Sequence, residues 1–189
     1  NNSLYYNAGS GTCYNDRSNA TTSCNFTKTG LKNDQTRNLI SKTLYYLGGY
    51  TSVYSDQMYE YERGTNLGSS PYASSIWEGY IALPYASDYG YAADFNSCRL
   101  KLDNYSNTSC TSTNWMNSIL GTSSYGWLLP PRYANSKYAF GVNSTGRVND
   151  SSDVSFARGI APVLYLESNA NIDGATTGTS DNPYKLTVN

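Results

Sequence analysis

Apolar side chains recur at helical spacing in two segments of the chain. In "NDQTRNLISKTLYYLGG", residues 33–49, the apolar positions between 39 and 47 fall on one face, Asn33 or Asp34 can cap the start, and Gly48 provides a stop. In "TSTNWMNSILG", residues 111–121, a two-turn apolar face precedes a terminal glycine, and Ser112 or Thr113 is the expected cap. That second face comprises Trp115, Met116, Ile119 and Leu120.

Elsewhere the pattern predicts short strands separated by long loops. Residues 161–166, "APVLYL", are an apolar and β-branched run flanked by turn residues, which is typical of a central buried strand. Further strands are expected at residues 77–85, 138–142, 146–148 and 184–188. Two helices, short antiparallel strands and long ordered loops predict an α+β domain.

Composition narrows the possible partners. The chain of 189 residues fits one domain, contains 20 tyrosines, is only 14% charged and carries a formal net charge of -1. It has no run of lysine or arginine, so nucleic acid and anionic membrane surfaces are unfavourable partners. No stretch of about 18 apolar residues occurs, so we expect no direct membrane insertion by this chain.

The four cysteines form two locally spaced pairs, Cys13 with Cys24 and Cys98 with Cys110. Three connectivities are compatible with the sequence, and local pairing is favoured because near neighbours close loops at low entropic cost. A zinc site is the alternative, but the chain has no histidine and no C-x-x-C spacing. Two disulfides indicate an oxidising, extracellular compartment.

Candidate catalytic residues are few. A serine or cysteine nucleophile normally requires a base, and histidine is absent. Carboxylates are present, but glycoside cleavage depends on their separation in space, which the sequence leaves open. We interpret Glu60 and Glu62 in "YEYERG" as a solvated strand face or as partners of Arg63.

The region from Ser123 to Leu166 places many Tyr, Asn, Ser, Gly, Lys and Arg residues between two apolar runs. Such side chains provide the rigid contact area and adaptable hydrogen bonds of binding surfaces, although an ordinary wet loop has a similar composition. The tryptophans Trp77, Trp115 and Trp127 could stack on sugars. Each sits among apolar residues, so core packing is the simpler interpretation, most clearly for Trp115.

The order of motifs from Gly30 to Val188 resembles bacterial surface proteins with a C-type-lectin-like domain. The quoted motifs are "RNLISKTLYYLGGY", "YERG", "IALPYASDYGYAADFNSC", "NWMNSILG", "GWLLPPR", "YAFGVNSTGRVND" and "GIAPVLYL". The last third is also similar to the variable proteins of diversity-generating retroelements and to the formylglycine-generating-enzyme branch of that fold. The resemblance implies a lectin-like domain over residues 30–189, and the spacing of Cys13 and Cys24 predicts a disulfide-clamped segment over residues 1–29 before it; we expect the two to form one compact unit.

The resemblance further implies a division between scaffold and display positions in the last third. The implied scaffold residues are Trp127, Leu128, Val142, Val148, Ile160, Val163 and Leu164. The implied ligand-facing residues are Arg132, Tyr133, Asn135, Lys137, Gly141, Asn143, Arg147, Asn149, Ser151, Ser152, Asp153 and Ser155.

Three departures limit what the resemblance implies. The arginine that relatives often carry at the entry to the last apolar run is replaced by Ala161, and an arginine stands earlier at Arg158. The calcium-lectin triplets E-P-N, Q-P-D and W-N-D are missing. No cysteine follows Cys110, whereas the enzyme branch needs a reactive pair near its C-terminus. We therefore expect no metal, no cofactor and no enzymatic activity.

Two functions remain as hypotheses. The first is an extracellular recognition or adhesion domain that binds a protein or glycan on another cell or particle through residues 130–158. The second is a structural or tip subunit of a pilus or surface fibre, in which tyrosine-rich faces pack against copies of the same chain.

Overall fold

The structure is a computed structural model of the whole chain. The residues that it describes are Tyr6 and residues 9–13, 22–27, 30–48, 51, 53–64, 76–121, 125–132, 135, 137–179 and 181–188, without the side chains of residues 12, 13, 22 and 188.

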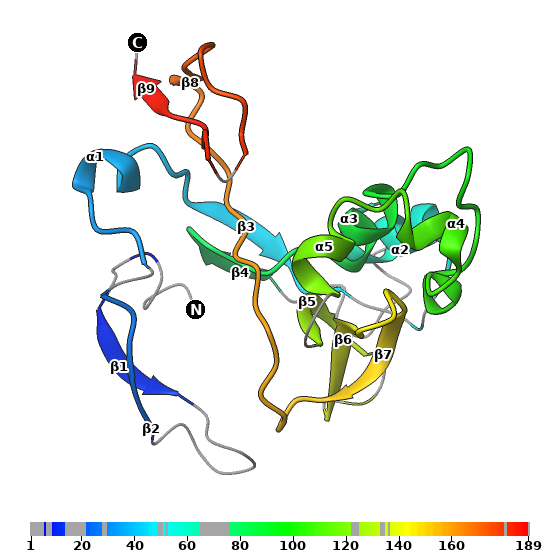
Figure 1. Cartoon of the computed structure of the whole chain (residues 1–189). Helices are drawn as coiled ribbons and strands as arrows, with labels where there is room; N and C mark the ends of the chain where they lie inside the picture. The colour runs from blue at the N-terminus through cyan, green and yellow to red at the C-terminus, as the bar shows by residue number, and fades with distance from the viewer. Residues whose placement is uncertain are drawn as a thin grey trace.

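The best-packed part of the molecule combines a small sheet with a group of short helices (Figure 1). The sheet is antiparallel, in the order β5 (Gly126–Pro131), β6 (Tyr138–Val142) and β7 (Val148–Asp153). The helices are α2 (Ser55–Arg63), α3 (Ala86–Tyr91), α4 (Thr108–Thr111) and α5 (Asn117–Leu120), with a 3₁₀ turn, η3, at Leu102–Asn104.

Three further antiparallel pairs lie beside this unit. They are β1 (Ser10–Cys13) with β2 (Thr22–Asn25), β3 (Thr43–Tyr46) with β4 (Ile76–Gly79), and β8 (Ala170–Ile172) with β9 (Leu186–Val188). The remaining helix is α1 (Asp34–Arg37). In Figure 1 the β1–β2 and β8–β9 pairs project away from the helices, and β3–β4 lies between. This arrangement confirms a mixed α+β chain with small antiparallel sheets.

The main core lies between the helices and the β5–β7 sheet. Met58, Tyr89, Leu102, Phe140 and Val148 are each 0% exposed in this cluster. A smaller cluster joins β3 to α3 through the buried side chains of Tyr45, Ala82 and Tyr85. Trp77, Leu129 and Val163 pack against it from outside. The predicted scaffold roles of Leu128, Val142 and Val148 are therefore confirmed, since each is at most 1% exposed.

The predicted helix over residues 33–49 is wrong beyond its first turn. Asn33 does cap a helix, because its side-chain oxygen accepts the Gln35 backbone N–H at 2.8 Å, but α1 ends at Arg37. Residues 43–46 instead pair with β4. Thr, Leu and Tyr suit a half-buried strand, and a partner strand supplies hydrogen bonds that an isolated short helix cannot match.

Of the predicted helix over residues 111–121 only the short helix α5 forms, and it does end before Gly121. Ser112 and Thr113 do not cap it, because they follow helix α4, which is capped by Asn107 through the Ser109 backbone N–H at 3.0 Å. Only Met116 and Leu120 of the predicted apolar face are buried; Trp115 is 64% exposed and Ile119 is 60% exposed.

The run at residues 161–166 is not a central buried strand. It crosses the molecule as an extended strap that makes isolated bridges, Val163 with Ala82 and Leu166 with Ile40. Leu164, Tyr165 and Leu166 are 37–46% exposed, so the predicted scaffold role of Leu164 is also wrong. The partner segments are too short to form a ladder, and Pro162 lacks the N–H that a ladder would need.

One of the two predicted disulfides is present: Cys98 is bonded to Cys110 across 12 residues of sequence. It links the segment after α3 to α4, and both sulfur-bearing side chains are buried. The side chain of Cys13 lies outside the described part of the structure, so the Cys13–Cys24 bridge stays a prediction. Among the described residues, no helix is long and apolar enough to cross a bilayer.

Val148→Asp should unfold or severely destabilise the protein. The side chain of Val148 is 0% exposed, and an unpaired carboxylate there would cost several kcal/mol against the total of about 5–15 kcal/mol that is typical of a domain. Arg147→Asp is the matched control, because it introduces the same carboxylate at the exposed neighbouring position and should change stability by about 0.5 kcal/mol or less. Chemical denaturation of both variants measures the difference; equal stabilities would contradict the inward orientation of Val148.

Candidate functional site

Where strand β6 begins, an aromatic ring lies beside two charge pairs. The Tyr138 ring has the Arg132 guanidinium carbon 5.6 Å and the Lys137 Nζ 5.8 Å from its centroid. Arg132 Nε lies 3.9 Å from Asp150 Oδ2, and Lys137 Nζ lies 3.3 Å from Asp153 Oδ2. The sheet thus brings together the predicted residues Arg132, Lys137 and Asp153 and adds two that the sequence interpretation missed, Tyr138 and Asp150.

The sequence contained a signal for one of these missed residues. Tyr138 lies opposite Asp153 in the β6–β7 ladder, so the hairpin register places the ring beside a predicted display position. The sequence interpretation placed Tyr138 neither among the scaffold residues nor among the ligand-facing residues.

Three turns of the form Asn/Asp-x-Ser/Thr fix the conformation of this surface. The side-chain oxygen of Asn143 accepts the backbone N–H groups of Thr145 and Arg147, each at 3.0 Å. Asn149 and Asp153 accept the N–H two residues ahead in the same way, at 3.0 Å, and the following serine hydroxyls donate to them at 2.8 and 2.7 Å. Side chains of this kind stabilise turns by replacing backbone hydrogen bonds. One side-chain oxygen in each of Asn143, Asn149 and Asp153 is therefore engaged in stabilising its turn.

The turn hydrogen bonds also affect ionisation. The backbone N–H and hydroxyl of Ser155, with a smaller contribution from Lys137, lower the pKa of Asp153 to about 2. Asp153 is consequently a fixed negative charge over the whole physiological pH range. Gly146, at φ 82°, completes the β6–β7 turn in the left-handed region that favours glycine.

The twelve predicted ligand-facing residues separate into four groups. Asn135, Lys137, Arg147 and Ser151 are exposed. Arg132, Asn143, Asn149, Asp153 and Ser155 are half-buried. Gly141 and Ser152 are buried, and Tyr133 lies outside the described residues.

The expected outward orientation of Gly141 and Ser152 is wrong. The β6–β7 register shifts between Ala139 and Gly141, which interrupts the simple alternation of inward and outward side chains. A Cβ at Gly141 would meet the Gly126 carbonyl oxygen at 2.9 Å and the Ser152 hydroxyl at 3.3 Å. Both residues therefore face a neighbouring strand rather than solvent.

Arg158, the arginine that stands shortly before the last apolar run, packs against two aromatic rings. Its guanidinium carbon lies 4.2 Å from the Tyr125 ring centroid and 5.0 Å from that of Trp127. Burial lowers the pKa of Arg158, while the ring contacts favour its charged form. Arg158 thus packs the segment just before the strap against the aromatic rings of Tyr125 and Trp127. The Trp127 backbone N–H also donates to the Gly159 carbonyl at 2.9 Å.

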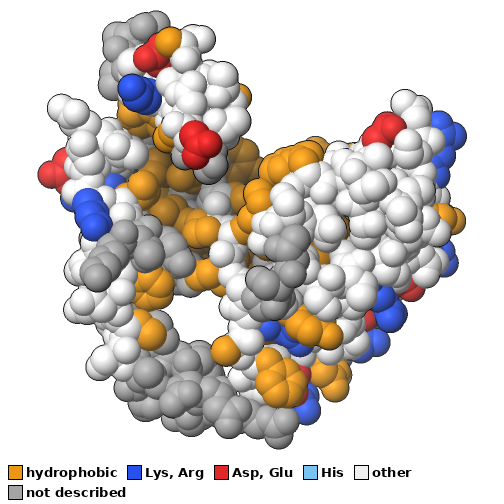
Figure 2. Space-filling model, viewed as in Figure 1, with side chains coloured by type: hydrophobic (Ala, Val, Ile, Leu, Met, Phe, Trp, Pro, Cys, Tyr) orange, Lys and Arg blue, Asp and Glu red, His pale blue; other side chains and the backbone are white. Residues whose placement is uncertain are grey.

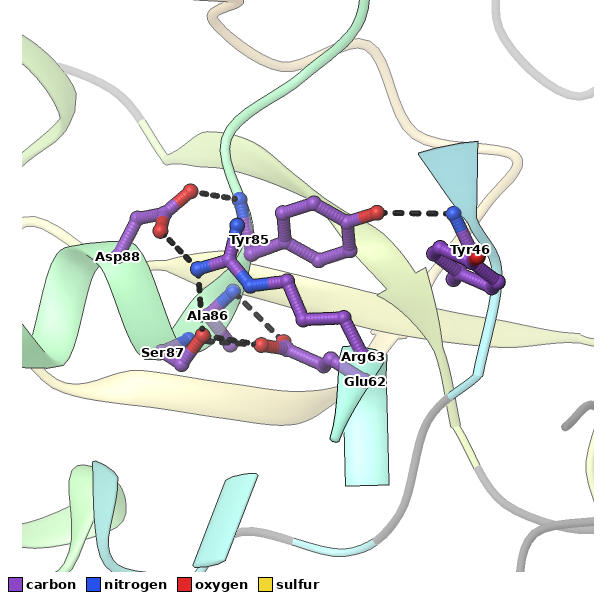
Figure 3. Close-up of polar contacts among 7 residues, drawn as sticks. All are labelled: Tyr46, Glu62, Arg63, Tyr85, Ala86, Ser87 and Asp88. Carbon is purple, nitrogen blue, oxygen red and sulfur yellow. Dashed lines mark hydrogen bonds and ion pairs between the residues drawn. The ribbon is translucent and has the colours of Figure 1, made fainter. Parts of the chain in front are cut away.

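A second polar cluster, drawn in Figure 3, lies inside the protein and was not anticipated. Glu62 is part of helix α2 rather than a strand, and its side chain is 0% exposed, so the expectation of a solvated face is wrong. Its carboxyl accepts the backbone N–H groups of Ala86 at 2.9 Å and Ser87 at 3.2 Å, and also the Ser87 hydroxyl. These groups form the first turn of α3, so Glu62 satisfies donors that α3 leaves unpaired.

Arg63 and Tyr85 extend the same cluster toward β3. Arg63 forms an ion pair with Asp88, donates to the Ser87 hydroxyl at 3.2 Å and lies 4.2 Å above the Tyr85 ring centroid (Figure 3). The Tyr85 hydroxyl accepts the Tyr46 backbone N–H at 2.9 Å. The expected pairing of Arg63 with the neighbouring glutamates is thus replaced by pairing with Asp88 of α3.

The chemistry of this internal cluster is structural. Burial raises the pKa of Glu62 to about 8, although its hydrogen bonds with Ser87 oppose the rise. A carboxyl with a raised pKa can serve as a general acid, but this one has no exposed surface from which to reach a substrate. We therefore assign it to the joint between α2, α3 and β3.

No group of three or more potential ligands is placed to hold a metal ion within the part of the chain that the structure describes. Comparisons with protein-family models, with curated proteins and with solved structures find no match. The resemblance to C-type-lectin-like proteins therefore rests on the sequence motifs alone.

Glu62 should make the protein less stable as pH rises. Its folded pKa of about 8 exceeds the ordinary value of 4.5, so the folded state binds the proton more tightly and its advantage is lost between pH 4.5 and about 8. Thermal unfolding between pH 5 and 8.5 should show a falling Tm, and Glu62→Gln should flatten that slope. Glu60→Gln, on the same helix but only half-buried, should keep it. A wild-type Tm that rises over this range would contradict the assignment.

Proposed function

We propose that this protein is an extracellular, non-enzymatic recognition or adhesion domain that binds a protein or glycan through the surface of residues 130–158. The observation that supports it best is that different side chains of the β5–β7 sheet and its flanking residues form the core and the surface. Phe140, Val142 and Val148 fill the core, whereas Arg132 and Lys137 are less buried, lie where β6 begins and have their charges held in pairs. Surface side chains in such an arrangement can change without altering the core.

Preorganisation strengthens the proposal. The turns at Asn143, Asn149 and Asp153 fix the backbone before any ligand arrives, which lowers the entropy lost on binding. Tyrosine and arginine are also the residue types that most often dominate binding energy. The Tyr138 ring between Arg132 and Lys137 is therefore the expected centre of the contact.

The proposed compartment and fold rest on two further features. A buried disulfide between Cys98 and Cys110 suits an oxidising environment, such as the cell surface. The C-type-lectin-like fold is proposed from the motif order, and a three-stranded sheet in its last third is compatible with it.

A fibre subunit is the second candidate, and exposed apolar surface favours it. Figure 2 shows hydrophobic side chains gathered in the hollow between the projecting β8–β9 pair and the helical unit. Leu44 and Ile76, on neighbouring positions of the β3–β4 ladder, are each 52% exposed, and the strap residues 164–166 are also exposed. Apolar patches of this kind often mark contacts between proteins. Self-association in analytical ultracentrifugation, lost in Leu44→Ser, would favour this role.

Folding and binding should separate on the proposed surface. Arg132→Ala, Lys137→Ala and Arg147→Ala should each change stability by about 0.5 kcal/mol or less, and at least one should weaken binding by more than about 1 kcal/mol. Binding is measured on glycan arrays and against surface proteins of neighbouring cells, with thermal unfolding in parallel. Lys185→Ala, an exposed lysine on the β8–β9 pair, is the control. Unchanged binding in all three variants would place recognition elsewhere.

A further inference from the structure

Trp115 is held rigidly outward, although its sequence context favours burial. Its backbone N–H donates to the Ala92 carbonyl at 3.3 Å, and its own carbonyl accepts the Ser118 hydroxyl at 2.8 Å. Its neighbours Asn114 and Met116 are buried, and the Asn114 amide donates to the Tyr89 carbonyl at 2.8 Å. With both neighbours anchored in the core, the indole projects into solvent and is 64% exposed.

Trp115 forms part of a groove of about 390 Å³. Pro84, Met116 and Val163 supply its apolar floor, Tyr91 supplies a second exposed aromatic side chain, and Asp88 supplies a carboxylate. This volume falls near the lower end of the range of roughly 300–1,000 Å³ that is usual for ligand sites. The groove therefore combines aromatic faces, apolar surface and a hydrogen-bond acceptor.

Tyr91 also lines an adjoining groove of about 400 Å³ along helix α2. There the Tyr59 and Tyr91 rings meet edge to face, with centroids 6.4 Å apart, and Asp56 and Glu60 contribute carboxylates. Among the described residues that line the two grooves, three are acidic and none is lysine or arginine. Tyr91 lines both grooves, and the two together are called the Trp115–Tyr59 groove.

We propose that the Trp115–Tyr59 groove is a glycan-binding site that takes a chain of neutral or amine-bearing sugars. A pyranose ring has an apolar face of C–H groups that packs on an exposed indole or phenol ring, while its hydroxyl groups point sideways. Asp56 and Glu60 can accept hydrogen bonds from those hydroxyl groups or from an ammonium group, whereas Asp88 already accepts from Arg63 and from the Tyr85 backbone N–H. The acidic lining disfavours sugars that carry carboxylate or sulfate groups.

The exposure of the aromatic rings favours a glycan chain over a peptide helix. Trp115, Tyr91 and Tyr59 are exposed by 64%, 49% and 40%, so successive rings are available at several points rather than in one deep hydrophobic pocket. The Trp115–Tyr59 groove shares no residue with the surface of residues 130–158, so the inference stands independently of the proposed function.

Binding to soluble oligosaccharides tests the proposal directly. The probes are chitin oligosaccharides, their deacetylated amine-bearing forms, cello-oligosaccharides and anionic oligogalacturonides, measured by isothermal titration calorimetry. Wild-type protein should bind at least one neutral or amine-bearing probe more tightly than the anionic one. Trp115→Ala should weaken that binding at least tenfold, and Tyr91→Ala should also weaken it.

Controls distinguish direct stacking from general damage. Ile119 is the third residue of the neighbouring helix α5, and its side chain is 60% exposed. Ile119→Ala removes that side chain and should leave binding within twofold. Saturating ligand should change tryptophan fluorescence in wild-type protein but not in Trp115→Phe. Thermal unfolding should show that all variants are folded, as expected for exposed positions.

Several outcomes would overturn the proposal. They are the absence of binding to any neutral or amine-bearing probe, a preference for the anionic probe, glycan binding unaffected by both Trp115→Ala and Tyr91→Ala, and capture of a protein ligand through Trp115 in place of glycan. Loss of glycan binding in Arg132→Ala or Arg147→Ala, with Trp115→Ala unaffected, would support the proposed surface and refute the groove. The reverse result would support the groove alone.

Discussion

The arrangement of the helices depends on the buried carboxyl of Glu62 at the start of helix α3. A short helix presents unpaired N–H groups at its first turn, and here those of Ala86 and Ser87 are satisfied from α2 rather than by a local cap. Desolvation of the carboxyl is costly, and three hydrogen bonds offset part of that cost. Arg63 and Tyr85 then connect the same joint to Asp88 and β3. A structure that places α3 in this way also fixes Tyr91 and the residues around Trp115.

A second constraint governs the β5–β7 sheet, where local turn chemistry and core packing act on different residues. The three Asn/Asp-x-Ser/Thr turns require nothing from distant parts of the chain, whereas Val142 and Val148 are buried only because the helices cover them. Arg158 connects this sheet to the strap by stacking on Tyr125 and Trp127. The backbone that carries the surface of residues 130–158 is therefore well supported.

The two candidate binding regions differ in their chemistry. The surface of residues 130–158 carries paired charges around Tyr138, which suits a partner that is itself polar and charged. The Trp115–Tyr59 groove carries aromatic rings and the carboxylates of Asp56 and Glu60, while its third acidic residue, Asp88, is paired with Arg63; this lining suits hydroxyl-rich or amine-bearing ligands. Their residues come from different elements, the first from β5–β7 and the second mainly from α2, α3 and the segment before α5. The two proposed sites therefore share no residue.

The sequence by itself determined the features that arise from neighbouring residues. These include the Asn33 cap, the β6 strand, the inward valines Val142 and Val148, and the Cys98–Cys110 bridge, because each depends on side chains that are close along the chain; the strand expected at residues 146–148 is instead β7 at residues 148–153. Only the tertiary structure decided the secondary structure and the burial of apolar residues whose partners are distant in the sequence. Residues 43–46 became a strand because β4 pairs with them, residues 161–166 stayed an exposed strap because they meet only isolated bridges, and Trp115 faced outward because Asn114 and Met116 took the buried positions. Glu62 was misread for the same reason: a charged residue is buried only where another element supplies its hydrogen bonds, and no local pattern encodes that element.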